Sequence, residues 1–206
     1  MPDSASCDST SISYVPNTVS GSAKLLVVGA FGVGKTTLIG SVSEIPPLRT
    51  EEAITAASVG VDSLHGVENK TTTTVALDFG RVTLGDSGDT VLYLFGTPGQ
   101  QRFWSLWDGL AEGAIGALVL IDLRRIDDSF AVLDRLEATG LPYVVAINDF
   151  PDAPRHADDE VRQALALPEA VLLHCNALDR RSSVDALITL VSHALTRLDA
   201  AEARIR

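Results

Sequence analysis

The sequence predicts an α/β fold in which about five helices cover both faces of a six-stranded, mostly parallel sheet, giving a three-layer sandwich. The 206 residues are 46% hydrophobic, which is enough for one sizeable core. Continuous apolar runs of strand length alternate with amphipathic segments, as expected for strands that are buried on both faces. Two strands in the first half are separated only by a turn at Gly85–Asp89, so one edge strand should run antiparallel.

These periodicities place the elements in chain order. The strands are expected at Lys24–Val28, Thr72–Leu84, Thr90–Phe95, Ala114–Ile121, Tyr143–Ile147 and Ala170–His174. The helices are expected at Lys35–Val42, Phe103–Glu112, Asp128–Thr139, Asp158–Leu165 and Ser182–Leu198. The segment between Glu44 and Lys70 is irregular, and a short helix at Glu51–Ala57 is one interpretation of part of it. Residues 1–22 are expected to form a disordered tail, residues 23–200 the folded domain, and residues 201–206 a C-terminal tail. In an open sheet of this kind, ligands bind at the carboxyl ends of the strands.

The composition argues against several classes of function. A formal net charge of −11 disfavours a nucleic-acid surface and direct binding to anionic lipid. Cys7 lies in the polar tail and Cys175 in an apolar run, which suggests a reducing compartment without a disulfide framework. The sequence shows neither a membrane-spanning segment nor a signal-peptide pattern. We therefore expect a cytoplasmic protein with no direct membrane insertion, so that any recruitment to the inner face of the membrane would depend on partners.

A glycine-rich loop after the first strand carries the strongest motif. The run Gly29-Ala-Phe-Gly-Val-Gly34-Lys35-Thr36 fits G-x-x-x-x-G-K-[ST], the phosphate-binding loop or P-loop. Glycines let backbone N–H groups surround a phosphate, and the following helix N-terminus adds its positive dipole end. Lys35 is expected to reach the β and γ phosphates and to act in catalysis, and Thr36 to bind Mg²⁺. The residues expected to bind phosphate in this loop are Gly29, Phe31, Gly32, Val33, Gly34, Lys35, Thr36 and Thr37.

A second motif follows the third expected strand. The segment Phe95-Gly-Thr-Pro-Gly-Gln100-Gln-Arg-Phe103 resembles D-T-A-G-Q-E-R-F, the second switch of Ras-like GTPases. The resemblance implies that Gln100 orients the attacking water and that Gly99 senses the γ-phosphate. Gly96 stands where the family has an aspartate that holds Mg²⁺ through water.

A run of threonines precedes the second switch along the chain. Aligned on the strand, Thr74 matches the switch threonine that closes on Mg²⁺ and the γ-phosphate, with Thr73 as the alternative register. An ordinary β-branched strand edge is the other interpretation.

Base recognition departs from the Ras-like pattern. Asn148-Asp-Phe-Pro151-Asp152 stands where N-K-x-D would read guanine, and Pro151 replaces the base-reading aspartate. Asp152, one residue later, is the expected substitute, and the N–H of Ala177 is the expected contact to the guanine oxygen. The residues expected at the base are Asn148, Phe150, Asp152, Ala177 and Leu178.

Residues 24–198 resemble the small GTPases encoded in bacterial conservon operons, distant relatives of the MglA polarity GTPases. The matching stretches include Gly32-Val-Gly-Lys-Thr-Thr37, Thr73-Thr-Val-Ala-Leu-Asp-Phe-Gly-Arg81, Leu92-Tyr-Leu-Phe-Gly-Thr-Pro-Gly-Gln100 and Arg102-Phe-Trp104. The resemblance implies a Ras-like fold with GTP and GDP as ligands and Mg²⁺ as cofactor. It also implies a Roadblock/LC7-type protein and an operon-encoded membrane histidine-kinase-like sensor as partners.

The leading interpretation is a GTP-hydrolysing switch in bacterial signalling. Hydrolysis should be slow, because Gly96 cannot hold the water that ties Mg²⁺ to the second switch and Phe31 crowds the site. No arginine finger is evident in the sequence, Lys70 and Arg102 being candidates only by proximity to the switches. One alternative is a nucleotide-binding scaffold without useful hydrolysis, and another is a P-loop kinase or ATPase.

Three aromatic residues, Phe103, Trp104 and Trp107, lie at helical spacing directly after Gln100. Packing in the core is the default interpretation for them. An exposed patch that binds a partner is the alternative.

Overall fold

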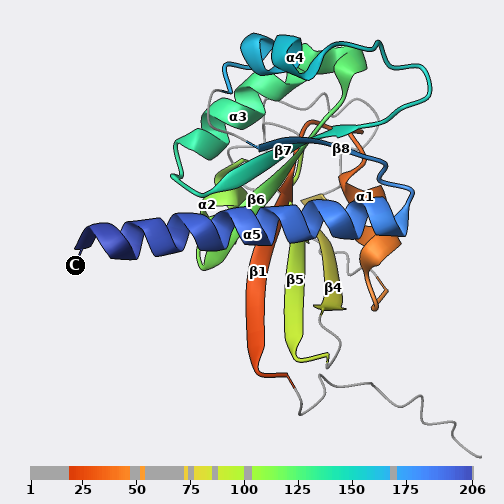
Figure 1. Cartoon of the computed structure of the whole chain (residues 1–206). Coiled ribbons are helices and arrows are strands. Elements are labelled where there is room, and N and C mark those ends of the chain that lie inside the picture. Colours follow the sequence, from red (N-terminus) through yellow and green to blue (C-terminus); the bar gives the residue numbers. More distant parts are fainter. Residues whose placement is uncertain are drawn as a thin grey trace, which may run out of the picture.

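The computed structural model describes residues 19–46, 52–53, 72–73, 77–84, 88–99, 104–167 and 171–205. Six strands form one sheet in the order β4-β5-β1-β6-β7-β8. Their bounds are Gly21–Val28 (β1), Asp78–Leu84 (β4), Thr90–Gly96 (β5), Ala114–Ile121 (β6), Tyr143–Asn148 (β7) and Val171–Cys175 (β8). Neighbouring strands are parallel except β4 and β5, which pair antiparallel at the edge (Figure 1). The predicted α/β sheet with one antiparallel edge strand is thus confirmed.

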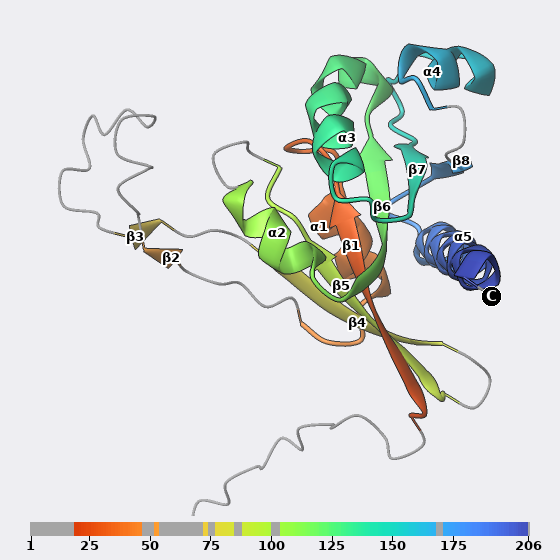
Figure 2. The ribbon, with the colours of Figure 1, turned by 90° about the vertical axis from the view of Figure 1, so that its left-hand side faces the viewer.

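Helices cover both faces of this sheet. Their bounds are Lys35–Val42 (α1), Ser105–Ala111 (α2), Phe130–Glu137 (α3), Asp158–Ala164 (α4) and Arg180–Ile205 (α5). A 3₁₀ helix, η2 (Leu123–Ser129), leads from β6 into α3. Figure 2 shows the sheet between α5 on one side and α2 and α3 on the other.

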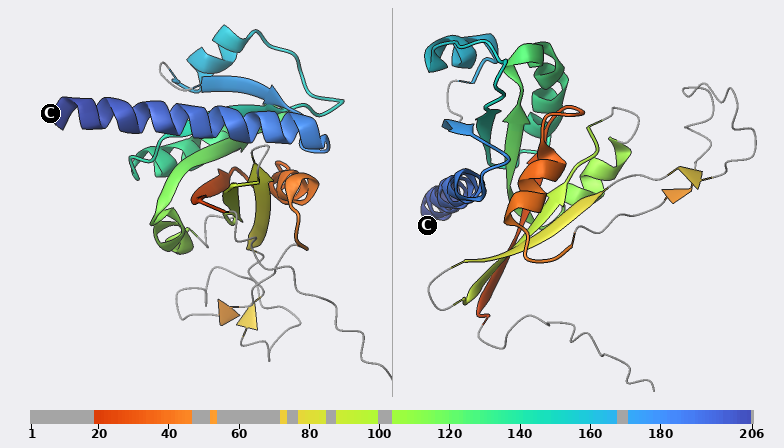
Figure 3. Two further views of the ribbon diagram at one scale, coloured as in Figure 1. Left: turned by 60° about the horizontal axis from the view of Figure 1, so that its bottom comes forward. Right: turned by 90° about the vertical axis from the view of Figure 1, so that its right-hand side faces the viewer.

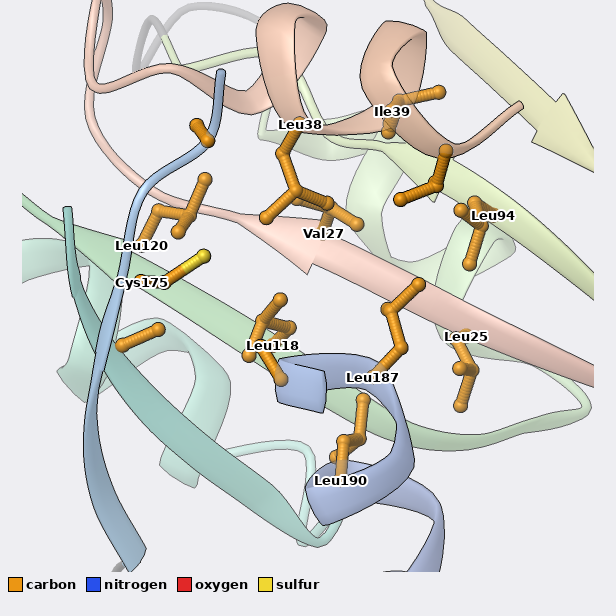
Figure 4. Packing of buried hydrophobic residues seen from close by; sticks show 14 of the residues in the cluster. Leu25, Val27, Leu38, Ile39, Leu94, Leu118, Leu120, Cys175, Leu187 and Leu190 are labelled. Atoms are coloured by element: carbon orange, nitrogen blue, oxygen red, sulfur yellow. The ribbon is translucent and has the colours of Figure 1, made fainter. Parts of the chain in front are cut away.

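Two hydrophobic clusters, one on each face, hold the three layers together. Side chains alternate along a strand, so Leu118 of β6 faces α1 and α5 whereas its neighbour Val119 faces α3. Figure 4 shows the first cluster, in which Leu38 of α1 and Leu187 of α5 pack around the central strands. This alternation explains why β1 and β6 read as continuous apolar runs.

The C-terminal end of α1 is joined to the beginning of α5. The Nη1 atom of Arg180 donates hydrogen bonds to the carbonyl oxygens of Val42 at 2.6 Å and Ser41 at 3.2 Å. The hydroxyls of Ser41 and Ser183 lie 3.2 Å apart. Arg180 therefore satisfies carbonyls that an α-helix leaves without partners in its last turn. Beyond this junction α5 runs across the sheet, and its last turns extend past the strands (Figure 3).

The first half of the chain differs from the sequence prediction. The strand expected at Thr72–Leu84 is interrupted, since β4 begins at Asp78. Thr72–Thr73 form a separate strand, β3, which pairs antiparallel with β2 at Glu52–Ala53. The helix expected at Glu51–Ala57 is therefore wrong at Glu52–Ala53, because the backbone of these residues pairs with β-branched threonines instead of closing a helical turn.

Two later helices also have different bounds. The helix expected from Asp128 begins only at Phe130, because η2 precedes it and the Asp122 carboxylate accepts a 3.0 Å hydrogen bond from the Arg124 backbone N–H. The closing helix is longer than expected at both ends and continues to Ile205.

The topology brings five loops to one edge of the sheet. The strands β1, β5, β6, β7 and β8 are parallel, so their carboxyl ends meet at this edge. The glycine-rich loop, the second-switch motif, η2 and both expected base loops leave the sheet from there. A ligand at this edge can contact all of them. Among the described residues, no helix is long and apolar enough to span a membrane.

Candidate functional site

The glycine-rich loop lies between β1 and α1, as its motif predicts. Three of its glycines have a positive φ, namely Gly29 at 147°, Gly32 at 78° and Gly34 at 108°. At Gly34 a side chain would also be excluded, because an added Cβ would lie 2.5 Å from the amide nitrogen of Asn148. The loop can therefore turn tightly against a neighbouring strand end while its N–H groups stay available for an anion.

Lys35 is folded back over this loop. Its Nζ donates to the carbonyl oxygens of Gly29 at 2.8 Å and Ala30 at 2.7 Å, and the residue is only 8% exposed. Burial lowers its pKa to about 8, and the nearby Asp78 carboxylate partly opposes this effect. A buried ammonium with few charged neighbours gains strongly from an added phosphate.

Two further features of the loop fit an anion. The helix α1 begins at Lys35, after the N-cap residue Gly34, and no side chain caps it, so its first N–H groups are open to a ligand. The hydroxyl of Thr97 is buried and has no hydrogen-bond partner among the described residues. Both groups border a hollow of about 320 Å³, lined mainly by Phe31, Gly32, Gly34, Lys35, Thr36, Thr37, Asp78, Thr97, Pro98 and Gly99. An unpaired buried hydroxyl beside an uncapped helix end is the kind of group that a phosphate or its bound water satisfies.

A carboxylate lies next to the predicted magnesium ligand in this hollow. The Thr36 hydroxyl donates a 2.6 Å hydrogen bond to Asp78 Oδ2, and Asp78 is only 8% exposed. Asp78 is the cross-strand partner of Gly96, and a Cβ on Gly96 would lie 2.9 Å from the Asp78 Cβ. Gly96 thus leaves room for a carboxylate that arrives from β4. A hydroxyl and a carboxylate facing a phosphate loop are suitable oxygen donors for Mg²⁺, which takes its other ligands from phosphate and water.

The switch residues are only partly described. Gly99 lies against the phosphate loop, since an added Cβ would stand 2.6 Å from the Phe31 backbone nitrogen. Gln100 and Thr74 lie outside the described residues, and Thr73 is described only as part of β3. Their predicted roles at the attacking water and at Mg²⁺ stay predictions.

Asn148, at the end of β7, joins the phosphate loop to the loop after β8. Its Nδ2 donates to the Val33 carbonyl at 2.9 Å, and its Oδ1 accepts from the Ala177 N–H at 3.1 Å. Asn148 is 5% exposed, so both hydrogen bonds are protected from water. The Ala177 N–H, expected at the guanine oxygen, is used within the protein in this structure. The side chain of Leu178, also expected at the base, is 81% exposed.

The loop after β7 is held by Arg124. Its guanidinium stacks on the Phe150 ring at 3.7 Å and donates to Asp152 Oδ1 at 2.9 Å. It also donates to both carboxylate oxygens of Asp122, and these hydrogen bonds, against the effect of burial, hold the pKa of Asp122 below its usual range. In the structure the Asp152 carboxylate therefore binds Arg124, and the Phe150 ring stacks on the same guanidinium.

The position that lysine has in N-K-x-D is occupied by Asp149, which pairs with a histidine. His174 Nδ1 lies 3.1 Å from Asp149 Oδ1, and His174 Nε2 lies 3.1 Å from Asp158 Oδ1. Hydrogen bonds first to Asp149 and then to Asp158 raise the pKa of His174. The two carboxylates thus favour an imidazolium beside the base loop.

Two residues at this edge were missed by sequence reasoning. In the sequence Asp78 is only one residue of an expected strand, although the register of the β4–β5 hairpin places it opposite Gly96. Arg125 is the second, because its Nη2 donates a 3.0 Å hydrogen bond to the Phe31 carbonyl of the phosphate loop. No periodicity signals Arg125, since its backbone is non-helical within η2.

The aromatic residues after the second switch are partly in the core. Trp107 is 1% exposed and its Nε1 donates to the Pro98 carbonyl at 3.3 Å. Trp104 is half-buried, with its ring centroid 5.8 Å from that of Trp107. Phe103 lies outside the described residues. Core packing therefore holds for Trp107, and it fixes the loop that carries Gly99.

Comparisons with known proteins agree with this geometry. A family model described as a conserved hypothetical ATP binding protein matches residues 27–197. The chain is 31% identical over 127 residues to the uncharacterized protein MJ1339 of Methanocaldococcus jannaschii. The matched region covers 61% of this chain and 68% of that protein. The G domain of the T. maritima FeoB iron transporter has a similar fold, with a TM-score of 0.53 and 16% identity, over 81% of this chain and 99% of that one. At this identity the structural likeness concerns the fold alone.

The family match includes the phosphate loop, the Thr36–Asp78 pair and Asn148. These are the groups that the structure gathers at the carboxyl edge of the sheet. The chain is therefore a nucleotide-binding P-loop protein, and it belongs to the conserved hypothetical ATP binding protein family.

Proposed function

We propose that this chain is a small GTP-binding switch in bacterial signalling, which hydrolyses GTP slowly to GDP and phosphate. The observation that carries the proposal is the position of Asn148, which joins the phosphate loop at Val33 to the base loop at Ala177. By the resemblance of Asn148-Asp-Phe-Pro151-Asp152 to N-K-x-D, Asn148 matches the asparagine of that motif. The guanine preference is expected to be weak, because Pro151 offers no base-reading carboxylate.

Different residues of the hollow would bind the phosphates and Mg²⁺. The Lys35 ammonium and the N–H groups of the loop bind the β and γ phosphates and offset the charge that develops on them. Thr36 and Asp78 would hold Mg²⁺, which would screen the phosphate oxygens when bound. Gln100 orients the attacking water and Gly99 follows the γ-phosphate, as the switch resemblance implies. Replacing Gln100 by Leu should lower the hydrolysis rate further.

The proposed partners follow from the resemblance to the conservon-encoded GTPases. A Roadblock/LC7-type protein would bind the switch face near Phe103 and Trp104, and a membrane histidine-kinase-like sensor would recruit the cytoplasmic protein to the membrane. Normal folding of a Trp104→Ala variant with unchanged Roadblock binding would exclude this face. A nucleotide-binding scaffold without useful hydrolysis is the alternative within this proposal.

A second candidate function is an ATPase, because Pro151 removes the usual guanine contact and Asp152 already binds Arg124. The experiment that separates the two is identification of the nucleotide that copurifies with the full chain, followed by competition between GTP and ATP for a labelled nucleotide. GDP in the purified protein and a GTP preference support the switch. ADP and an ATP preference support the ATPase, and the absence of both nucleotides supports the scaffold.

The metal proposal has its own test. Asp78→Asn keeps the shape of the side chain but removes its charge, so the concentration of Mg²⁺ needed for half-maximal GTP binding should rise about tenfold or more. Asp108→Asn is a matched control, since Asp108 is exposed and pairs with Arg135 away from the hollow. Equal Mg²⁺ dependence in wild type and both variants would remove Asp78 from the metal site.

A further inference from the structure

Arg125 lies at the same edge of the sheet as the phosphate loop and belongs to none of the sequence motifs. It follows the carboxyl end of β6, inside η2, with φ −144° and ψ 51°. This irregular backbone separates it from its neighbour Arg124, which faces Asp122, Asp152 and Phe150. Two consecutive arginines therefore contact different loops. Arg124 contacts the loop after β7, and Arg125 contacts the phosphate loop.

The contacts of Arg125 hold its guanidinium in place without using most of its donors. Its Nη2 donates to the Phe31 carbonyl at 3.0 Å, the one hydrogen bond of this side chain within the described part of the chain. The carboxylates of Asp122 and Asp128 each lie 3.6 Å from a guanidinium nitrogen, which orients the charge. The side chain remains 46% exposed. A guanidinium has five N–H donors, so several remain for a ligand.

The guanidinium also lies beside the position where the γ-phosphate is expected. A second hollow, of about 280 Å³, is lined in part by Ala30, Phe31, Gly99 and Arg125. It shares Phe31 and Gly99 with the hollow that contains Lys35 and Thr36. Gly32 of the phosphate loop is also close to the guanidinium, since an added Cβ would stand 3.5 Å from Arg125 Nη2. The two hollows meet at the residue expected to sense the γ-phosphate.

Phe31 bears on which arginine can reach this place. Its side chain is 67% exposed at the loop, and the sequence leads us to expect that this bulk crowds an arginine arriving from a partner protein. Arg125 reaches the loop from within the chain and binds the backbone of the same residue. No arginine finger is evident in the sequence, whereas in the structure the Arg125 side chain lies against the phosphate loop.

We infer that Arg125 is a catalytic arginine supplied in cis for hydrolysis of the γ-phosphate. This inference rests on the proposed nucleotide hydrolysis. Water attacks the γ-phosphorus, the bond from that phosphorus to the β–γ bridging oxygen breaks, and the bond's electron pair leaves with GDP. The proton of the water passes to solvent or to the released phosphate. Arg125 donates N–H groups to the bridging and γ oxygens, where the negative charge grows.

The test uses the full chain with Arg125→Ala, Arg125→Lys and Arg135→Ala. Single-turnover hydrolysis of GTP and of ATP is measured beside GDP affinity and binding of GDP with aluminium fluoride, a transition-state mimic. Wild type should turn over on the order of 10⁻² per second, as proteins with an arginine in cis do. Arg125→Ala should lower this rate roughly 20- to 30-fold and abolish the aluminium fluoride complex, with GDP affinity within about threefold of wild type. Arg125→Lys keeps the charge without the planar fork and should recover only part of the rate.

Arg135→Ala removes an arginine that pairs with Asp108 and lines neither hollow, and it should behave as wild type. A rate within about threefold of wild type in Arg125→Ala overturns the inference, and the switch proposal stands. Loss of GDP affinity with an unchanged rate for the bound fraction also overturns it, because Arg125 then only shapes the loop. Arg125-dependent hydrolysis of ATP alone supports the inference and overturns the guanine assignment. A wild-type chain that hydrolyses neither nucleotide overturns both.

Discussion

At the scale of single residues, Lys35 makes the phosphate site sensitive to pH. Burial lowers its pKa to about 8, so the ammonium is half deprotonated at pH 8 in the protein without nucleotide. A bound phosphate favours the charged form, and nucleotide binding should therefore take up protons. The uptake should rise from about a tenth of a proton at pH 7 to about three quarters at pH 8.5. Calorimetric titration with GDP in two buffers of different ionisation enthalpy measures it.

The control for this prediction is Lys35→Arg, because a guanidinium does not titrate in this range. Lys35→Ala, in contrast, should abolish nucleotide binding, since it removes the one side-chain ammonium that contacts the phosphate loop within the part of the chain that the structure describes. Proton uptake by the wild type that stays flat between pH 7 and 8.5 would contradict the role of Lys35 at the phosphates.

A second pH effect belongs to His174. Hydrogen bonds to Asp149 and Asp158 raise its pKa in the folded state above the usual value of about 6.5. The stabilisation is therefore complete below about pH 6.5 and is lost as the pH rises through the folded-state pKa. Its size should be small, because the imidazole and both carboxylates are about half exposed.

Urea unfolding of wild type and His174→Gln from pH 5.5 to 8.5 measures this contribution. The difference in unfolding free energy should shrink with rising pH, and the opposite effect of Lys35 above pH 8 cancels in the difference. Parallel curves would mean that the imidazole does not gain its proton from these carboxylates.

At the scale of elements, the loop between β7 and α4 decides base preference. Pro151→Asp restores the carboxylate of N-K-x-D, and a buried charged hydrogen-bond pair of this kind contributes about 2–3 kcal/mol. GTP binding should therefore tighten at least about tenfold relative to ATP, as measured by competition. Equal gains for both nucleotides would show that another residue reads the base.

Asp152→Asn provides the comparison for Pro151→Asp. In the structure the Asp152 carboxylate binds Arg124, so its loss should leave the ratio of GTP to ATP affinity unchanged. A fall in that ratio would instead assign base reading to Asp152, as the sequence alone predicts.

The elements also show what sequence patterns can predict. Lys35–Val42 and Ala114–Ile121 were predicted with the bounds that the structure has, because a G-K-T loop starts a helix and a doubly buried strand is continuously apolar. The phosphate loop could also be predicted from the sequence, since its residues are contiguous. Asp78 and Arg125 depend on strand register and on a kinked 3₁₀ turn, and these are set by tertiary contacts that no local periodicity encodes.

At the scale of the whole molecule, the layers follow from where apolar residues lie along the chain. Alternation on β1 and β6 requires cover on both faces, and the amphipathic helices between the strands provide it. The order of the strands then places five loops at one edge. The chemistry of that edge, however, combines residues that are far apart in sequence, such as Asn148 with Val33.

The junction between α1 and α5 links the phosphate loop to the longest helix. One end of α1 is open towards the phosphates, and the other end is closed by Arg180, which lies at the start of α5. Ordering α1 by nucleotide should therefore slow amide hydrogen exchange in the first turns of α5. Exchange measured by mass spectrometry with and without GDP should show this protection in wild type and in Arg181→Ala. Arg180→Ala should keep the protection in α1 and lose it in α5, and equal protection of α5 in both variants would contradict the link.

Through this link, nucleotide binding at the phosphate loop would affect the order of α5 at a distance from the pocket. At 1.5 Å per residue its 26 residues span roughly 39 Å. The far end of this helix lies beyond the strands, where the nucleotide itself cannot reach (Figure 3). A protein that binds this far end of α5 would then respond, through the rigidity of the helix, to whether phosphate is bound at the loop before α1.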